Sequence, residues 1–348
     1  MFYIHQNTCI SPQQTFLQNL PQTVQPVQED QLRAIEPGYE GIPPGVLRRM
    51  GKASRMGIGA ALPLLKQEGI KPDGFILGTA NGGMEDAIKF LKQIVEYDEG
   101  VLTPGNFVQS TPNAIAGQLG LFSKNTGYNI THVHGALSFE NAVLDADMLL
   151  NEFPAKNYLL GGVDEISSFN YNIDCLAGWY RKNVHTEADF YAGNSEGAVA
   201  GEGAAMFLVG KNPAGAVAQV KAVSMLHSSD PDTVSQHMAT FLHKYLPPGE
   251  TIDTLLSGEN GDTRFARYYK DCEAALNGDP TILRFKHLSG EYATATATAV
   301  WLAAGMLQTQ RVPQHMIKKA GTISACKNLL IYNQHKNLQH SWMLLSAV

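Results

Sequence analysis

Hydrophobic and polar positions follow one another in blocks along the chain and predict an α/β protein. Short apolar runs that end in glycine indicate buried strands, and stretches with apolar residues every three or four positions indicate helices. For the first part of the chain, the pattern predicts helices over 46–67, 84–97, 114–121 and 139–150, and strands over 74–79, 129–134, 158–162 and 204–209.

The second part repeats this alternation more briefly, with a seam near 210–218. We therefore predict two similar β/α halves, 1–210 and 211–348, and a mainly parallel sheet that is covered on both faces. The uncharged stretch 292–310 is rich in Ala and Thr and is only about as long as a minimal membrane span. We interpret it as a buried helix. The other elements predicted here are a helix over 265–276 and strands over 252–256, 281–285, 328–332 and 342–345.

Composition excludes several classes of function. Hydrophobic residues make up 44% of the chain and charged residues 17%, which is typical of a globular protein. The net charge of −6 offers no basic face for nucleic acid. Four isolated cysteines and an N-terminal stretch without the pattern of a signal peptide predict a cytoplasmic protein without a membrane span.

The stretch 131–146, THVHGALSFENAVLDA, predicts a strand that turns directly into a helix. Many enzymes place a nucleophile at such a corner, because the first-turn N–H groups of the helix stabilise an anion there. In this chain, the corner residue is Ala136, which has no nucleophilic group.

Four further stretches combine with this corner into a wider pattern: 113–117 (NAIAG), 160–165 (LGGVDE), 197–204 (GAVAGEGA) and 286–291 (KHLSGE). In order and spacing, the five resemble the landmarks of β-ketoacyl synthases, the condensing enzymes of the thiolase fold. The resemblance covers roughly residues 74–348. It implies an αβαβα layered body made of two similar halves.

The chemistry of that family needs a cysteine that accepts an acyl group and two histidines that promote decarboxylation and stabilise the enolate. Alignment on the glycines places Ala136 at the cysteine position. The first histidine falls at Gly258 or, one residue earlier, at Ser257. Glu291, five residues after Lys286, takes the place of the second histidine. The resemblance therefore implies that all three catalytic side chains are absent.

The resemblance places four more side chains around this vestigial pocket: Ser138, Glu259, Lys286 and His335. Glu259 and Glu291 could form a carboxylate pair for acid/base chemistry. Alternatively, Glu291 pairs with Lys286 and fills the space of the lost histidine. The family's glycine-rich gate loop has its counterpart at 333–340, which contains no glycine, so we expect a less mobile loop.

Three other patterns have a functional and a structural interpretation. His132 and His134 point to one side of a strand and could bind a metal, but no third ligand is evident and we expect packing instead. Ser195 lies in a GxSxG pattern that leads toward a strand, which favours a plain turn over a nucleophile elbow. Ser138 could accept an acyl group or simply bond the backbone in the first helical turn.

A preserved scaffold without the triad resembles the chain-length factors of bacterial type II polyketide systems. The corner is most similar to proteins of aryl polyene and flexirubin pathways. This implies a non-condensing subunit of an acyltransferase family that serves polyketide and fatty acid biosynthesis, with no cofactor. Its partners would be a cysteine-bearing ketosynthase, or a second copy in a homodimer, and an acyl carrier protein.

In that interpretation, Ile130, His132 and His134 form the dimer seam, and Leu137 and Phe139 limit the acyl channel. The alternative function is an acyl transferase or thioester hydrolase with a rebuilt set of catalytic residues, Ser138, His134 and Glu291.

Overall fold

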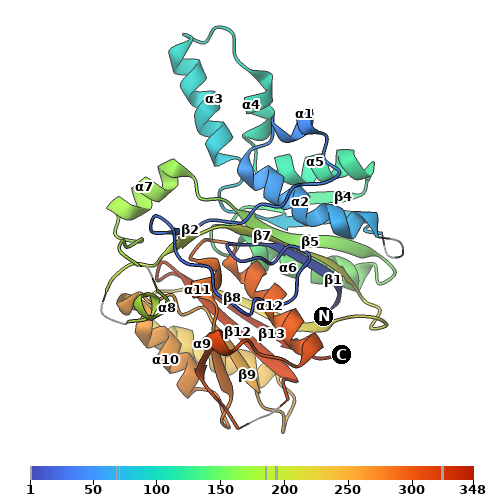
Figure 1. Ribbon diagram of the computed structural model, residues 1–348. Coiled ribbons are helices and arrows are strands. Elements are labelled where there is room, and N and C mark those ends of the chain that lie inside the picture. The colour runs from blue at the N-terminus through green and yellow to red at the C-terminus, as the bar shows by residue number, and fades with distance from the viewer. Residues whose placement is uncertain (1, 68, 70, 185, 193–194, 323–324) are drawn as a thin grey trace.

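The computed structural model describes residues 2–67, 69, 71–184, 186–192, 195–322 and 325–348. Figure 1 shows helices packed on both sides of sheet layers. The helices are α1 (Pro44–Leu47), α2 (Lys52–Lys66), α3 (Met84–Glu96), α4 (Pro104–Gln109), α5 (Ala114–Ser123), α6 (Ser138–Glu152), α7 (Ser168–Leu176), α8 (Glu187–Phe190), α9 (Pro231–Tyr245), α10 (Ala266–Ala274), α11 (Lys286–Ser289) and α12 (Ala295–Thr309). The strands are β1 (Phe2–Ile10), β2 (Gln31–Leu32), β3 (Gly74–Gly78), β4 (Tyr128–His132), β5 (Asn157–Asp164), β6 (Ala200–Gly201), β7 (Gly203–Gly210), β8 (Ala218–His227), β9 (Thr254–Ser257), β10 (Thr281–Arg284), β11 (Ile317–Lys319), β12 (Asn328–His335) and β13 (Gln339–Ser346).

The strand order shows that the two halves of the chain have the same topology. The main sheet runs β11-β10-β9-β12-β13-β8-β1-β7-β5-β3-β4. β1 and β8 lie next to each other at the centre of this order. From β1 outward, the N-terminal strands follow as β1, β7, β5, β3 and β4; from β8 outward, the C-terminal strands follow as β8, β13, β12, β9 and β10, with β11 at the end. In each half, the strands in spatial order are the first, fifth, fourth, second and third of the five in chain order. Two similar β/α halves are thus confirmed.

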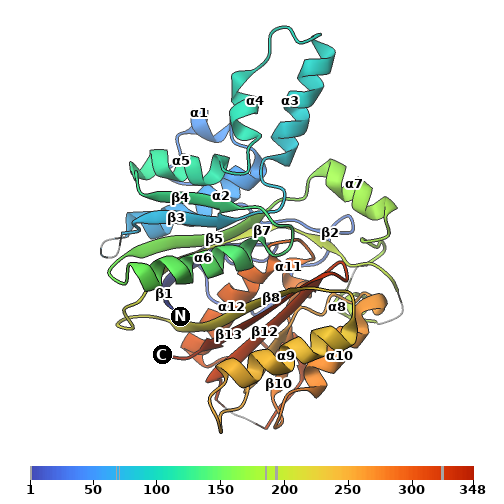
Figure 2. The ribbon, with the colours of Figure 1, turned by 180° about the vertical axis from the view of Figure 1, so that it is seen from behind.

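Each helical layer corresponds to a separate part of the core. Helices α2 and α5 pack on the outer face of the β3–β5–β7 part of the sheet, and α9 and α10 lie on the opposite outer face. Between them lie α6 and α12 (Figure 2). Residues of these two helices share one large core cluster with residues of both halves. This αβαβα arrangement confirms the expected fold class.

The expectation of a mainly parallel sheet is wrong, because the sheet is mixed. Strands joined by crossover helices are parallel, as in the β3–β4, β3–β5, β9–β10 and β9–β12 pairs. The central pairs β1–β7, β1–β8, β5–β7, β8–β13 and β12–β13 are antiparallel. The sequence pattern did not predict strands at Phe2–Ile10 or Ala218–His227, and these two strands join the halves.

The stretch 292–310 forms a buried helix, as expected. Helix α12 spans Ala295–Thr309, and twelve of its fifteen residues are buried. Small side chains allow close packing: a Cβ on Gly162 of β5 would lie 2.7 Å from that of Ala297. Within the described residues, no helix is both long and apolar enough to cross a bilayer.

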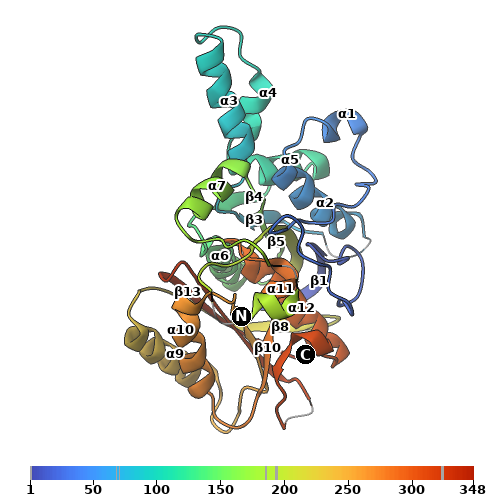
Figure 3. The ribbon, with the colours of Figure 1, turned by 60° about the vertical axis from the view of Figure 1, so that its left-hand side comes forward.

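Smaller differences follow from local backbone geometry. The helix expected over 46–67 divides into α1 and α2, because Gly51 adopts an extended conformation before Lys52. Helices α3 and α4 form an arm that projects from the body (Figure 3). Within the arm, Phe90 packs against Phe107. The division into 1–210 and 211–348 falls between β7 and β8 and stays a prediction as a domain boundary.

Candidate functional site

The strand-to-helix corner forms part of the wall of a cavity. Strand β4 ends at His132, Gly135 has a φ of 56°, and α6 begins at Ser138. Ala136 is 3% exposed, and with Gly135 it lines a cavity of about 300 Å³. No cysteine is among the described residues that line this cavity.

The backbone N–H groups of the corner are already bonded within the protein. Ala136 N donates to the Gln339 side-chain oxygen at 2.8 Å, Leu137 N to His134 O at 3.1 Å, and Ser138 N to Gly135 O at 3.3 Å. These are the donors that would stabilise an anion in an enzyme of this geometry. The corner therefore keeps its shape without presenting these donors to a ligand.

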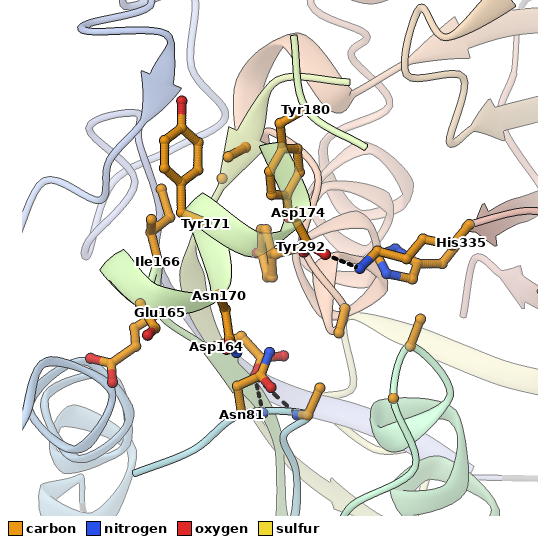
Figure 4. Close-up of a pocket in the computed structure, with 18 of the residues that line it drawn as sticks. Asn81, Asp164, Glu165, Ile166, Asn170, Tyr171, Asp174, Tyr180, Tyr292 and His335 are labelled. Atoms are coloured by element: carbon orange, nitrogen blue, oxygen red, sulfur yellow. Dashed lines mark hydrogen bonds and ion pairs between the residues drawn. The ribbon is translucent and has the colours of Figure 1, made fainter. Parts of the chain in front are cut away.

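Both halves of the chain contribute to the cavity wall. Asn81 and Asp164 lie at one end, Tyr171 and Tyr180 at the other, and His335 enters from one side (Figure 4). The remaining lining residues are Ala80, Glu165, Ile166, Ser167, Asn170, Asp174, Ala200, Gly201, Tyr292, Ala293, Lys336 and Gln339.

Asp164 fixes the floor of the cavity. Its carboxylate accepts hydrogen bonds from Thr79 Oγ1, Ala80 N and Asn81 N on one side and from Thr294 N and Oγ1 on the other. Burial raises the pKa of Asp164, and these five donors oppose that effect. The side chain thus connects the turn after β3 to the start of α12.

Glu291 lies behind the cavity in a network of four polar side chains. It accepts from Lys286 Nζ at 2.8 Å and from Asn260 Nδ2 at 2.7 Å, and His335 Nδ1 lies 3.4 Å from Oε1. Burial alone would raise the pKa of Glu291, but Lys286 and His335 hold it at about 2. The carboxylate is therefore ionised and held in place by its neighbours.

Glu259 does not take part in that network. Its carboxylate accepts from Lys318 at 2.6 Å and lies 3.6 Å from Arg284. The Glu291 carboxylate instead contacts Lys286, Asn260 and His335. Among the described residues, the geometry supports the ion pair with Lys286 rather than a carboxylate pair.

Gly258, one of the two residues that the resemblance aligns with the first histidine, has no room for a side chain. A Cβ at this residue would lie 2.2 Å from Asn333 Oδ1 and 3.1 Å from Asn333 Cα. Asn333 is 2% exposed and donates to Thr296 Oγ1 at 3.2 Å. The asparagine fills the space that a side chain at position 258 would need.

The counterpart of the gate loop is a tight β-hairpin. Strands β12 and β13 pair up to His335 and Gln339, and Leu338 N donates to His335 O. Lys336 and Asn337 have φ values of 49° and 61°, as in a type I′ turn. Lys336 also bonds Asp174 at 2.7 Å, so the hairpin tip is held against α7.

Ser138, Leu137 and Phe139 face inward at the start of α6. The Ser138 hydroxyl accepts from His134 N at 2.8 Å and donates to Gly135 O at 2.7 Å, which is the backbone-bonding role. Phe139 is fully buried with its ring centroid 6.0 Å from that of Phe207, and Leu137 is 4% exposed. Neither lines the cavity, so their channel role stays a prediction.

The three residues expected at a dimer seam lie on or next to β4, at the end of the sheet. Ile130 packs on the central core, His132 Nε2 lies 3.0 Å from Asp145 Oδ2, and Asn141 bonds exposed His134 at 3.1 Å. Both histidines thus have partners from α6. Within the described part of the chain, no group of three or more His, Cys, Asp or Glu residues is placed to hold a metal ion.

The GxSxG pattern lies partly outside the described residues, since Gly193 and Asn194 are not described. Ser195 accepts a hydrogen bond from the Arg181 guanidinium at 2.5 Å. Its carbonyl oxygen accepts from Thr263 N at 3.2 Å. Ser195 is not among the residues that line the cavity next to Ala136.

Sequence reasoning missed Glu140, a fully buried carboxyl on α6. Its Oε1 accepts from Ser341 at 2.8 Å, whereas Oε2 has no hydrogen-bond partner. Burial raises the pKa of Glu140 to about 7, against the opposing effects of Ser341, Thr296 and Lys286. A charged residue on the inner face of the predicted helix was the available signal.

This raised pKa predicts that Glu140→Gln stabilises the protein at high pH. In the folded state, Glu140 keeps its proton up to about pH 7, whereas in the unfolded state it loses the proton near pH 4.5. The free energy of unfolding of the wild type therefore falls as pH rises between these values. We expect Glu140→Gln to gain on the order of 2 kcal/mol relative to wild type between pH 5 and pH 8. Urea unfolding at both pH values measures this; a constant difference would contradict it.

Comparisons with known proteins agree with this geometry. Residues 21–173 match the family model described as beta-ketoacyl synthase, N-terminal domain. A beta-ketoacyl synthase from Burkholderia phymatum STM815 superposes with a TM-score of 0.77 at 15% identity, covering 100% of this chain and 99% of that one. A ketosynthase in complex with its chain length factor from Xenorhabdus doucetiae gives 0.77 at 13%, covering 100% and 98%, and the ishigamide ketosynthase/chain length factor gives 0.76 at 13%, covering 100% and 99%. No curated protein matches the sequence.

Together, the layered fold and the corner define the class as the thiolase-like fold of condensing enzymes. Residues 21–173 match the N-terminal domain model of the β-ketoacyl synthases, and the chain as a whole has the fold of a solved β-ketoacyl synthase. The resemblance carried by the ordered sequence landmarks is thereby confirmed.

Proposed function

We propose that this chain is a non-condensing ketosynthase-like subunit. It would act as chain-length factor or scaffold for a cysteine-bearing ketosynthase in bacterial type II polyketide or polyene biosynthesis. The observation that carries this proposal is the corner, where Ala136 has a methyl group and its own N–H is bonded to Gln339. A methyl group cannot form a thioester, so the acyl chain must be held covalently by another protein.

Two features of the network behind the cavity support the same conclusion. Glu291 is an ionised carboxylate, and a negative charge there disfavours a developing enolate instead of stabilising it. Gly258 has no side chain and no space for one. The solved structures with this fold include ketosynthases paired with a chain length factor and a ketosynthase in complex with an acyl carrier protein. We include both kinds of partner in the proposal.

The edge of the sheet at β4 is the surface that we assign to the partner subunit. β4 is the last strand of the sheet, and an exposed strand edge favours pairing with another chain. Apolar side chains are exposed beside it: Tyr128 is 38%, Val133 52% and Leu121 of the neighbouring α5 80% exposed. The surface is therefore suited to an apolar, strand-bearing partner.

Co-expression with a ketosynthase from the same organism tests the proposal. We expect a heterodimer by size-exclusion chromatography with light scattering. After incubation with acyl thioesters of the carrier protein, intact mass should show an adduct on the ketosynthase alone. A covalent acyl adduct on this chain would support the rebuilt transferase or hydrolase instead, and a chain that never pairs would exclude the scaffold role.

Val133→Lys is expected to weaken that heterodimer by at least about tenfold, because it places a charge in the apolar part of the interface. Val348→Lys is the matched control, since Val348 is 64% exposed at the other end of the chain and should leave assembly unchanged. Analytical ultracentrifugation of both variants measures the dissociation constants. Equal constants would remove β4 from the interface.

A further inference from the structure

Gln339 connects the β12–β13 hairpin to the corner, 203 residues away in the sequence. Its side-chain oxygen accepts from Ala136 N at 2.8 Å, and its side-chain nitrogen donates to His134 O at 3.2 Å. One carboxamide therefore bonds the backbone on both sides of Gly135. The contact is close: a Cβ on Gly135 would lie 2.8 Å from the Gln339 oxygen.

The Ala136 N–H is the donor that matters for acyl transfer at this corner. When a nucleophile at the start of a helix attacks a carbonyl, the developing oxyanion lies close to the backbone N–H of the residue that carries the nucleophile. The Gln339 oxygen occupies that place with the geometry of a carbonyl acceptor. A thioester carbonyl would have to displace it.

The hairpin makes this displacement difficult. The turn at Lys336 and Asn337 is closed by the Leu338 N to His335 O bond, and Ser228 N donates to Leu338 O at 2.8 Å. Lys336 is bonded to Asp174 at 2.7 Å. The backbone of Gln339 is thus held on one side by β12 and on the other by β8, where it pairs with His227.

We propose that Gln339 is a positioning residue that closes the anion-binding corner by occupying the place of a thioester carbonyl at the Ala136 N–H. This inference rests on the proposed function, because it explains how a subunit without the nucleophile also rejects the acyl thioester as a ligand. It assigns to one side chain the exclusion of substrate from the corner.

Supplying the missing nucleophile tests the proposal. In the Ala136→Cys variant, acyl transfer from an acyl-pantetheine thioester forms a C–S bond to residue 136 and breaks the one to pantetheine. The thiol proton of residue 136 ends on the released pantetheine thiol. We compare three proteins: the single variant Ala136→Cys, the double variant Ala136→Cys/Gln339→Ala, and the double variant Ala136→Cys/Leu338→Ala, which is the control in the same hairpin. Intact mass measures acylation, and iodoacetamide alkylation measures exposure of the thiol.

Acylation should be on the order of 10²-fold faster with Gln339→Ala than in Ala136→Cys alone, the effect typical of one oxyanion donor. Alkylation should be similar in all three, and Leu338→Ala should not accelerate acylation. Equal acylation rates, or no acylation in any variant despite alkylation, would overturn the proposal.

A second measurement does not depend on the introduced cysteine. In the otherwise unchanged protein, Gln339→Ala should speed hydrogen exchange of the peptide that contains residues 133–139, whereas Leu338→Ala should not. Unchanged exchange would also overturn the proposal. An acyl adduct on the unmodified chain would contradict the proposed function instead, so the two failures are distinguishable.

Discussion

Replacement of Lys286 by methionine is expected to lower the free energy of unfolding by about 3–5 kcal/mol at neutral pH, the usual cost of leaving one member of a buried ion pair without its partner. Lys286 is fully buried and lies 2.8 Å from Glu291, which is itself 4% exposed. Methionine fills a similar volume but leaves the carboxylate with only Asn260 and His335. Urea unfolding followed by circular dichroism measures the loss.

Lys319→Met is the control for this prediction, because Lys319 forms an ion pair with Asp279 at a similar distance, 2.7 Å, on the surface. Such pairs contribute about 0–1 kcal/mol. Similar losses for the two variants would contradict the special role of the buried pair. The pH dependence gives a second check. The pKa of Glu291 is lowered from 4.5 to about 2, so this stabilisation is present above pH 4.5 and is lost as pH falls toward 2.

The three positions that the resemblance assigns to the triad each contact a residue of the β12–β13 hairpin. Asn260 follows Gly258 by two residues and bonds Glu291, which contacts His335 on the cavity wall. In the same hairpin, Gln339 pairs with His335 and bonds the corner at Ala136. Polar contacts within the protein thus surround Ala136 and Glu291, whereas Asn333 Oδ1, next to Gly258, is buried without a hydrogen-bond partner among the described residues. At Gly258 and Glu291, a change to the family's histidine therefore has a structural cost.

The elements that the sequence predicted well are those whose signal is local. Helix α6 begins one residue before the first expected position, because apolar residues at three- and four-residue spacing define its inner face. Helix α12 was predicted from an uncharged run of small residues. The corner between β4 and α6, and hence the position of Ala136, follows from these local patterns.

The elements that the sequence did not predict depend on contacts between distant segments. Strand β1 contains His5, Gln6 and Thr8 yet lies in the middle of the sheet. Thr8 bonds the Ala60 carbonyl, whereas His5 Nε2 and Gln6 Oε1 are buried without a hydrogen-bond partner in the described part of the chain. Gln339 was part of a stretch noted only for its lack of glycine. Its bond to Ala136 spans 203 residues, and no local pattern indicates it.

Substitution of Gly258 by histidine is expected to destabilise the protein by about 1–3 kcal/mol or more, because it inserts a side chain into filled space. Its Cβ would meet Asn333 Oδ1 at 2.2 Å, and Asn333 Cα at 3.1 Å prevents a simple rotation of that side chain from relieving the contact. Gly38→His is the control, since a Cβ at Gly38 meets nothing within 4 Å and should leave stability nearly unchanged. Thermal and urea unfolding compare the two.

The same geometry predicts that restoring all three family residues does not restore condensation. In the triple variant Ala136→Cys/Gly258→His/Glu291→His, the change at Glu291 removes the carboxylate that pairs with fully buried Lys286. The change at Gly258 displaces Asn333. We expect the triple variant to be less stable than Ala136→Cys and to release no CO₂ from a malonyl thioester of the carrier protein. A folded triple variant that decarboxylates malonyl thioester would show that the scaffold still accommodates the triad. In that outcome, the three residues alone would prevent condensation, and the surrounding network would have no part in it.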